Sequence, residues 1–220
     1  MTTQFKDRTE AGQFLASRLT AFANRPDVLV LALPRGGVPV AAEVAKKLNA
    51  PFDVFVVRKL GLPDHPELAM GAIATGGVRV INRNVVEGLG IPDLVIDAVA
   101  AQEQEELARR QHAYRDDLPP PVVRGKTIIL VDDGIATGST MIAAVAALRQ
   151  LRAGRIVVAT PVIARSTFYQ IHNVADEVAA VIAPEEFHGV GEWYENFSQT
   201  TDDEVRRLLA ETNHREAVAA

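Results

Sequence analysis

The chain has 220 residues, of which 48% are hydrophobic and 23% charged, a balance that excludes a disordered protein and suits one well-buried domain with an appendage. A net charge of -5 argues against a general nucleic-acid surface, which would need a basic stripe. Because the chain lacks cysteine, a signal-like start and any apolar run near the ~20 residues that span a membrane, we expect a cytoplasmic protein without a membrane partner.

Apolar runs alternate with helical patterns, which predicts an α/β fold with an open parallel sheet and crossover helices. Strands are expected at Val28–Leu33, Val54–Val57, Thr127–Val131, Ile156–Pro161 and Val178–Ile182, and helices at 38–48, 139–152 and 166–174. A short hairpin is expected at Ala72–Ala74 and Val78–Ile81. We treat 1–220 as one domain, with a core at about 25–185 and a small C-terminal hood and helix at about 186–212.

The first strand is followed by Leu33-Pro34-Arg35-Gly36-Gly37. Two glycines allow the backbone to approach a ligand closely, the next helix N-terminus favours negative charge, and Arg35 adds a forked donor. These features predict an anion site. Taken alone, they would be better explained by an ordinary glycine turn between a strand and a helix.

The next expected strand is closed by Arg58 and Lys59, and open parallel sheets bind ligands beyond the carboxyl ends of their strands. We therefore expect both side chains to face the same crevice as Arg35, although a basic pair there is often only a solvated edge. A loop from Gly61 to Gly71 follows, and its titratable groups include His65 and Glu67. Such residues on a polar loop are more often solvated than catalytic.

A long amphipathic helix is expected at Asp93–Arg115. Its partly apolar face would hold Leu94, Ala98, Ala101 and Leu107. The helix could shield the site or form a contact between two copies of the chain. A stiff proline segment, 118–121, then leads into the third expected strand.

That strand ends in two adjacent carboxylates, Asp132 and Asp133, and is followed by a glycine- and hydroxyl-rich turn that opens a helix. A carboxylate pair can accept hydrogen bonds from a vicinal diol. The turn can hold a phosphate through the backbone N–H groups of Ala136, Thr137, Gly138, Ser139 and Thr140. The side-chain hydroxyls of Thr137, Ser139 and Thr140 add further donors. The sequence has neither the lysine-containing P-loop nor the dinucleotide glycine motif, so a sugar 5-phosphate is the favoured ligand.

Near the C-terminus, the segment from Phe187 to Phe197 holds four aromatic residues in a protein that is only 5% aromatic. A flat wall made by Trp193 and Tyr194 could stack on a nucleobase. The same rings could instead pack a C-terminal helix at 202–210 onto the core.

The segment Ile128–Thr140 resembles the signature of type I phosphoribosyltransferases, which is four apolar residues, two acids and a loop that ends Thr-Gly-x-Thr. In overall layout the chain is most similar to an uncharacterised bacterial branch of that family. The resemblance implies that Asp132 and Asp133 bind the ribose hydroxyls of phosphoribosyl pyrophosphate (PRPP) and that residues 136–140 bind its 5-phosphate. It also implies that Arg35, Gly36 and Gly37 form the pyrophosphate loop, with a cis Arg35–Gly36 peptide bond.

The resemblance carries further roles. Arg58 and Lys59 would contact the diphosphate or its magnesium-bound waters, and His65 or Glu67 would act from a lid over the reaction centre. Arg165 lies near the place where 6-oxopurine enzymes use a lysine to recognise the base, and Trp193 and Tyr194 lie in the hood segment. A homodimer and a Mg²⁺ cofactor are expected on the same basis, with no protein ligand to the metal assigned.

The resulting hypothesis is a pentosyltransferase of nucleotide salvage, which moves the phosphoribosyl group of PRPP to a nitrogenous base, with a purine as one candidate, and releases pyrophosphate. The alternative is a PRPP-binding regulatory or sensor protein with little transferase activity. A structural metal-binding domain is disfavoured, because cysteine is absent and the histidines are scattered.

Overall fold

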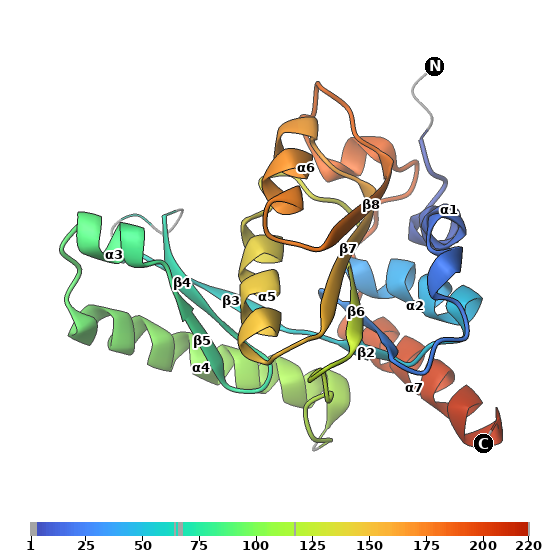
Figure 1. Cartoon of the computed structure of the whole chain (residues 1–220), viewed down its shortest axis with the longest axis horizontal. Helices are drawn as coiled ribbons and strands as arrows, with labels where there is room; N and C mark the ends of the chain where they lie inside the picture. Colours follow the sequence, from blue (N-terminus) through green and yellow to red (C-terminus); the bar gives the residue numbers. More distant parts are fainter. Residues whose placement is uncertain (1–3, 64, 66–67, 117, 220) are drawn as a thin grey trace.

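The computed structural model describes residues 4–63, 65, 68–116 and 118–219, and after Glu211 it describes the backbone alone. Within those residues the chain forms a parallel sheet of five strands and a separate antiparallel sheet of three (Figure 1). Residues Thr20–Phe22 and Val190–Trp193 form the short 3-10 helices η1 and η2.

The parallel sheet has the strand order β2-β1-β6-β7-β8. Its strands are β1 (Val28–Ala32), β2 (Phe52–Val54), β6 (Thr127–Val131), β7 (Arg155–Val162) and β8 (Glu177–Ile182). All residues of β1 and β6 are buried, as expected for central strands covered on both faces. The observed sheet confirms the expected fold class.

Side chains that alternate along these strands belong to two hydrophobic clusters, one on each face of the sheet. Helices α1 (Arg8–Arg18), α2 (Gly37–Leu48) and α7 (Asp202–Ala219) contribute to the first cluster. Helices α5 (Ser139–Gln150) and α6 (Arg165–His172) contribute to the second. The parallel register places Ala32 beside Val131, so the loops after β1 and β6 leave the same edge of the sheet side by side.

The antiparallel sheet forms an arm that extends to the left in Figure 1. It consists of β3 (Val57–Gly61), β4 (Ala69–Ala74) and β5 (Val78–Ile81), and α3 (Arg83–Gly88) follows it. Helix α4 (Asp93–Arg115) contacts β3 and β4, and α5 contacts all three strands of this sheet. The predicted hairpin is therefore present, with β3 as an additional strand.

The strand expected at Val54–Val57 is wrong, because the chain changes sheets within it. β2 ends at Val54, and the backbone N–H of Phe55 makes the last hydrogen bond to Ala32 of the parallel sheet. The next N–H, of Val56, donates to the hydroxyl of buried Thr75 at 2.9 Å. β3 then begins at Val57 and pairs with β4.

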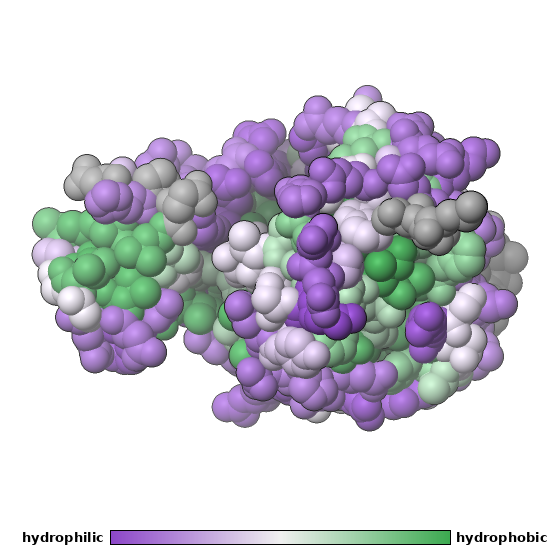
Figure 2. Space-filling view, turned by 90° about the horizontal axis from the view of Figure 1, so that it is seen from above, coloured by the Kyte–Doolittle hydropathy of each residue, from purple (hydrophilic) through white to green (hydrophobic). Residues whose placement is uncertain are grey.

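The apolar face expected for the long helix is also largely wrong, although its bounds are those predicted. Leu94 is 80% exposed, and Ala98 and Ala101 are exposed as well. The neighbouring stripe of the helix is buried instead, at Ile96, Ala100 and Leu107. Figure 2 shows hydrophobic surface over the outer end of the arm. Leu89, just after α3, and Leu94, in the first turn of α4, are both exposed.

The start of the chain is part of the fold, although the expected core begins near residue 25. Helix α1 begins after Asp7, whose side chain accepts a hydrogen bond from the backbone N–H of Glu10, and it packs on α2. Phe5 pairs with Tyr194 in a short parallel bridge. Among the described residues, no helix combines the length and the apolar character that crossing a bilayer requires.

Candidate functional site

The two adjacent carboxylates lie where β6 ends. The backbone N–H of Asp132 continues the sheet to Ala159 at 3.3 Å, and the N–H of Asp133 turns back to Oδ1 of Asp132 at 2.9 Å. Burial raises the pKa of Asp132 well above its usual range, and the neighbouring charge of Asp133 adds to the effect. Burial also raises the pKa of Asp133, and Arg8 opposes that rise.

Arg8, which no sequence motif identifies, forms the ion pair of this site. Its Nε lies 2.7 Å from Oδ2 of Asp133, and the two side chains are 11% and 13% exposed. An arginine at the start of a helix carries no signal of its own, so its role could be found only from the folded chain. The pair brings together residues that are 125 positions apart.

The glycine loop after β1 lies directly against the carboxylates. A Cβ atom on Gly36 would be 2.0 Å from Oδ2 of Asp133, and one on Gly37 would be 2.7 Å from the backbone oxygen of Val131. Both positions therefore require glycine for lack of space. A non-proline cis peptide bond is present in this loop, but it joins Pro34 to Arg35, so the expected position after Arg35 is wrong by one residue.

The turn after the acidic pair leads into α5 as predicted. Gly138 has a φ of 75°, a left-handed conformation that favours glycine. The hydroxyl of Thr167 on α6 donates to the backbone oxygen of Ala136 at 2.5 Å, and the hydroxyls of Thr137 and Ser139 lie 3.4 Å apart. The first N–H groups of α5 have no partner within the helix, so the turn offers donors to an anion.

This arrangement of strand, acidic pair and turn can now be compared with known proteins. A family model described as the phosphoribosyl transferase domain matches residues 2–196. The chain belongs to that family. The match confirms the family resemblance drawn from the signature at Ile128–Thr140.

Two relatives in Mycobacterium tuberculosis, one from strain CDC 1551 / Oshkosh and one from strain ATCC 25618 / H37Rv, are each 46% identical to the chain over 205 residues. Both bear names that describe candidate phosphoribosyl transferases. The match covers 93% of this chain and 46% of each relative, so the chain spans about half the length of these relatives. The crystal structure of TT1426 from Thermus thermophilus is similar with a TM-score of 0.87 and 37% identity, covering 95% of this chain and 99% of that chain.

The basic pair of this phosphoribosyl transferase domain does not follow a strand of the parallel sheet. The strand β2 of the parallel sheet ends at Val54, and Arg58 and Lys59 lie within the next strand, β3 of the arm. The guanidinium of Arg58 lies 2.6 Å from Oε2 of Glu103 on α4, and both basic residues line a pocket of about 380 Å³ between β3 and α4. Their predicted position beyond a core strand is thus wrong.

The lid loop is described in part. His65 is exposed, and its backbone N–H and carbonyl form local bonds with Leu62 and Leu68. Glu67 lies outside the described residues. NH1 of Arg35 in the glycine loop lies 3.5 Å from Oδ1 of Asp202 at the start of α7, and both side chains are partly exposed.

The aromatic hood residues of the domain are packed rather than open. Trp193 is 9% exposed and stacks on Phe187, with ring centroids 6.4 Å apart. Tyr194 is 4% exposed, contacts Phe5 and donates its hydroxyl to the backbone oxygen of Asp133 at 2.5 Å. Neither ring forms an exposed wall, and the two rings pack with the N-terminal segment and β7 rather than with the C-terminal helix.

Arg165 begins α6 and is half exposed. Its guanidinium lies 2.7 Å from Oε1 of Glu185, and its Nε donates to the backbone oxygen of Ala183 at 3.4 Å. The base-recognition roles of Arg165, Trp193 and Tyr194 stay predictions.

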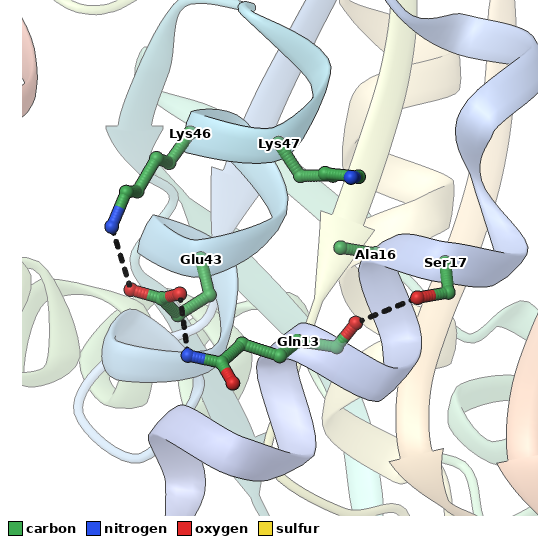
Figure 3. A pocket seen from close by; sticks show the side chains of 6 residues that line it. All are labelled: Gln13, Ala16, Ser17, Glu43, Lys46 and Lys47. Carbon is green, nitrogen blue, oxygen red and sulfur yellow. Dashed lines mark hydrogen bonds and ion pairs between the residues drawn. The ribbon is translucent and has the colours of Figure 1, made fainter.

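A further pocket lies between α1 and α2 (Figure 3). The side chains of Gln13 and Lys46 both reach Glu43, at 3.1 Å and 4.0 Å. Lys46 is nine residues beyond Gly37 on the same helix, about 14 Å along its axis. This pocket is therefore separate from the carboxylate site. Within the described part of the chain, no cluster of three or more metal-binding side chains is present.

Proposed function

We propose that this domain transfers the 5-phosphoribosyl group from PRPP to a nitrogenous base and releases pyrophosphate. The observation that carries the proposal is that the glycine loop packs on the acidic pair, and that the turn at residues 136–140 follows this pair directly in the chain. Ribose, pyrophosphate and 5-phosphate are the three parts of PRPP, and each would be bound by one of these three segments.

The acidic pair is suited to a vicinal diol. Oδ1 of Asp132 accepts the N–H of Asp133, and Oδ2 of Asp133 accepts Nε of Arg8. The two carboxyl groups also share a side-chain hydrogen bond with each other. We propose that the 2- and 3-hydroxyls of the ribose replace this bond and donate to one oxygen of each residue.

In the proposed reaction the bond from C1 of the ribose to pyrophosphate breaks, and its electron pair leaves with the pyrophosphate. A bond forms from C1 to a nitrogen of the base through an oxocarbenium-like transition state, and the proton of that nitrogen is released. The domain would act by positioning and charge neutralisation, with Arg35 beside the pyrophosphate and His65 as a candidate for the proton.

Magnesium belongs to the proposal as a companion of the substrate. The described side chains do not form a metal cluster, and one oxygen of Asp133 is held by Arg8. Pyrophosphate oxygens are good ligands for Mg²⁺, so we propose that the ion arrives with PRPP.

A homodimer is also proposed, and sedimentation equilibrium would measure the oligomeric state.

The test is a titration of the purified protein with PRPP and Mg²⁺, followed by a pyrophosphate-release assay with a panel of purine and pyrimidine bases. Asp133→Asn should weaken PRPP binding by roughly 100-fold or more, because an amide nitrogen cannot accept a hydroxyl proton. Asp97→Asn, at an exposed position on α4, is the matched control.

Failure of the wild-type protein to bind PRPP, or equal binding by wild type and Asp133→Asn, would refute the proposal. Binding without pyrophosphate release for every base would favour the PRPP sensor over the transferase.

A further inference from the structure

Arg8 contacts the acidic pair from outside the signature. It lies at the start of α1, and its Nε donates to Oδ2 of Asp133 at 2.7 Å. Because both side chains are nearly buried, water screens the pair little. The planar guanidinium also fixes the direction of the bond, as the ammonium of a lysine would not.

The guanidinium of Arg8 is held on two further sides by the segment 193–198. Its NH1 donates to the backbone oxygen of Ser198 at 2.7 Å, and its carbon lies 4.0 Å from the ring centroid of Phe197. Tyr194 in the same segment bonds to the backbone oxygen of Asp133. The segment 193–198 therefore holds the backbone of Asp133 directly through Tyr194, and it holds the side chain of Asp133 through Arg8.

The N-terminal segment and the segment 193–198 are joined by main-chain bonds. The N–H of Phe5 donates to Trp193 at 2.8 Å, and the N–H groups of Glu195 and Asn196 donate to Phe5 and Lys6 at 2.8 and 3.0 Å. Arg8 thus extends from a rigid support, which is what a side chain needs in order to orient another group.

We propose that Arg8 is a positioning residue that holds Oδ2 of Asp133 and thereby directs Oδ1 toward the ribose hydroxyls of PRPP. This inference rests on the proposed function. Its basis is that the carboxylate is fixed from both sides, by Arg8 and by the backbone of Gly36, where a Cβ atom would lie 2.0 Å from the same oxygen. Asp132 and Tyr194 are the other titratable groups beside it.

The experiment compares Arg8→Gln, Arg8→Lys and Phe197→Leu with wild type. Arg18→Gln is the control, because Arg18 is an exposed arginine of the same helix. The dissociation constant of PRPP is measured from about pH 5 to about pH 8, and the carboxyl ¹³C signal of Asp133 is followed by NMR over the same range. Circular dichroism verifies that each variant is folded.

Arg8→Gln should raise the dissociation constant about tenfold or more. It should also move the titration midpoint of Asp133 upward, because the opposing positive charge is lost. Arg8→Lys should weaken PRPP binding with a smaller change in midpoint, since it keeps the charge and loses the geometry. Phe197→Leu should have an intermediate effect on binding.

Wild-type values for both measurements in Arg8→Gln would overturn the inference. If both Arg8 variants were unfolded, Phe197→Leu would decide, and unchanged PRPP binding by that variant would overturn it. Failure of the wild-type protein to bind PRPP would instead refute the proposed function, and with it the role of Arg8 toward the ribose.

Discussion

Gly36 and Asp133 pack so closely that a methyl group on Gly36 would lie 2.0 Å from Oδ2 of the carboxylate. Gly36→Ala should therefore displace the loop or the carboxylate, cost about 1–3 kcal/mol of stability and strongly weaken PRPP binding. Gly88→Ala is the control, because a Cβ atom there meets nothing within 4 Å. Thermal denaturation and PRPP titration of the two variants would measure the difference, and equal behaviour would contradict the packing argument.

Asp132 should limit the stability of the protein at neutral pH. Its folded pKa is raised by burial, so its contribution to stability is present below the unfolded value and is lost as the pH rises through the folded value. Asp132→Asn removes the buried charge and keeps an oxygen for the N–H of Asp133. We expect its melting temperature to exceed that of wild type by a few degrees at pH 7, with the difference shrinking in acid.

The same substitution should impair PRPP binding, because one of the two acceptors for the diol is replaced by an amide. A melting temperature lower than that of wild type by the same amount at every pH would show that burial of the Asp132 charge is not the dominant effect. Differential scanning calorimetry at several pH values makes the measurement.

Gly138 combines a left-handed backbone with a tight contact, since its Cβ atom would lie 2.6 Å from Cγ2 of Thr167. Gly138→Ala should cost about 1–3 kcal/mol and weaken binding of the 5-phosphate. Adding Thr167→Ser removes the clashing methyl group and keeps the hydroxyl bonded to Ala136. The double variant should recover part of the stability in chemical denaturation, and no recovery would mean that backbone strain alone is responsible.

A substitution of Trp193 can distinguish a packing role from a role in base recognition. Its indole Nε1 is buried and has no hydrogen-bond partner among the described residues. Trp193→Phe removes this unsatisfied donor and leaves a ring to stack on Phe187, so we expect a stability change within about 1 kcal/mol. If Trp193 contacts the acceptor base, the KM for that base in the pyrophosphate-release assay should rise while PRPP binding stays constant.

The features that could be predicted from the sequence are those in which local pattern and burial agree. The run Ile128–Val131 is apolar because β6 is buried on both faces, and the glycines at 36 and 138 occupy positions that exclude a side chain or need positive φ. The parallel pairing of β1 with β6 then brings the loops that follow these two strands to one edge of the sheet.

Other features depend on contacts between distant segments. Nothing near Val56 signals that its N–H will leave the parallel sheet for Thr75, 19 residues away. The sequence predicted an apolar face of α4 that includes Leu94, but packing in the folded chain buries Ile96 and leaves Leu94 exposed. The aromatic cluster near Trp193 indicates a buried ring as readily as a stacking wall.

The pairing of Arg8 with Asp133 and with Ser198 has a consequence for the order of folding. These contacts join residues separated by 125 and 190 positions, and such distant contacts form late because the intervening chain must first be ordered. During synthesis, the β6 strand can pair with β1 before the segment 193–198 leaves the ribosome. The oriented carboxylate of Asp133 would therefore be among the last parts of the domain to mature.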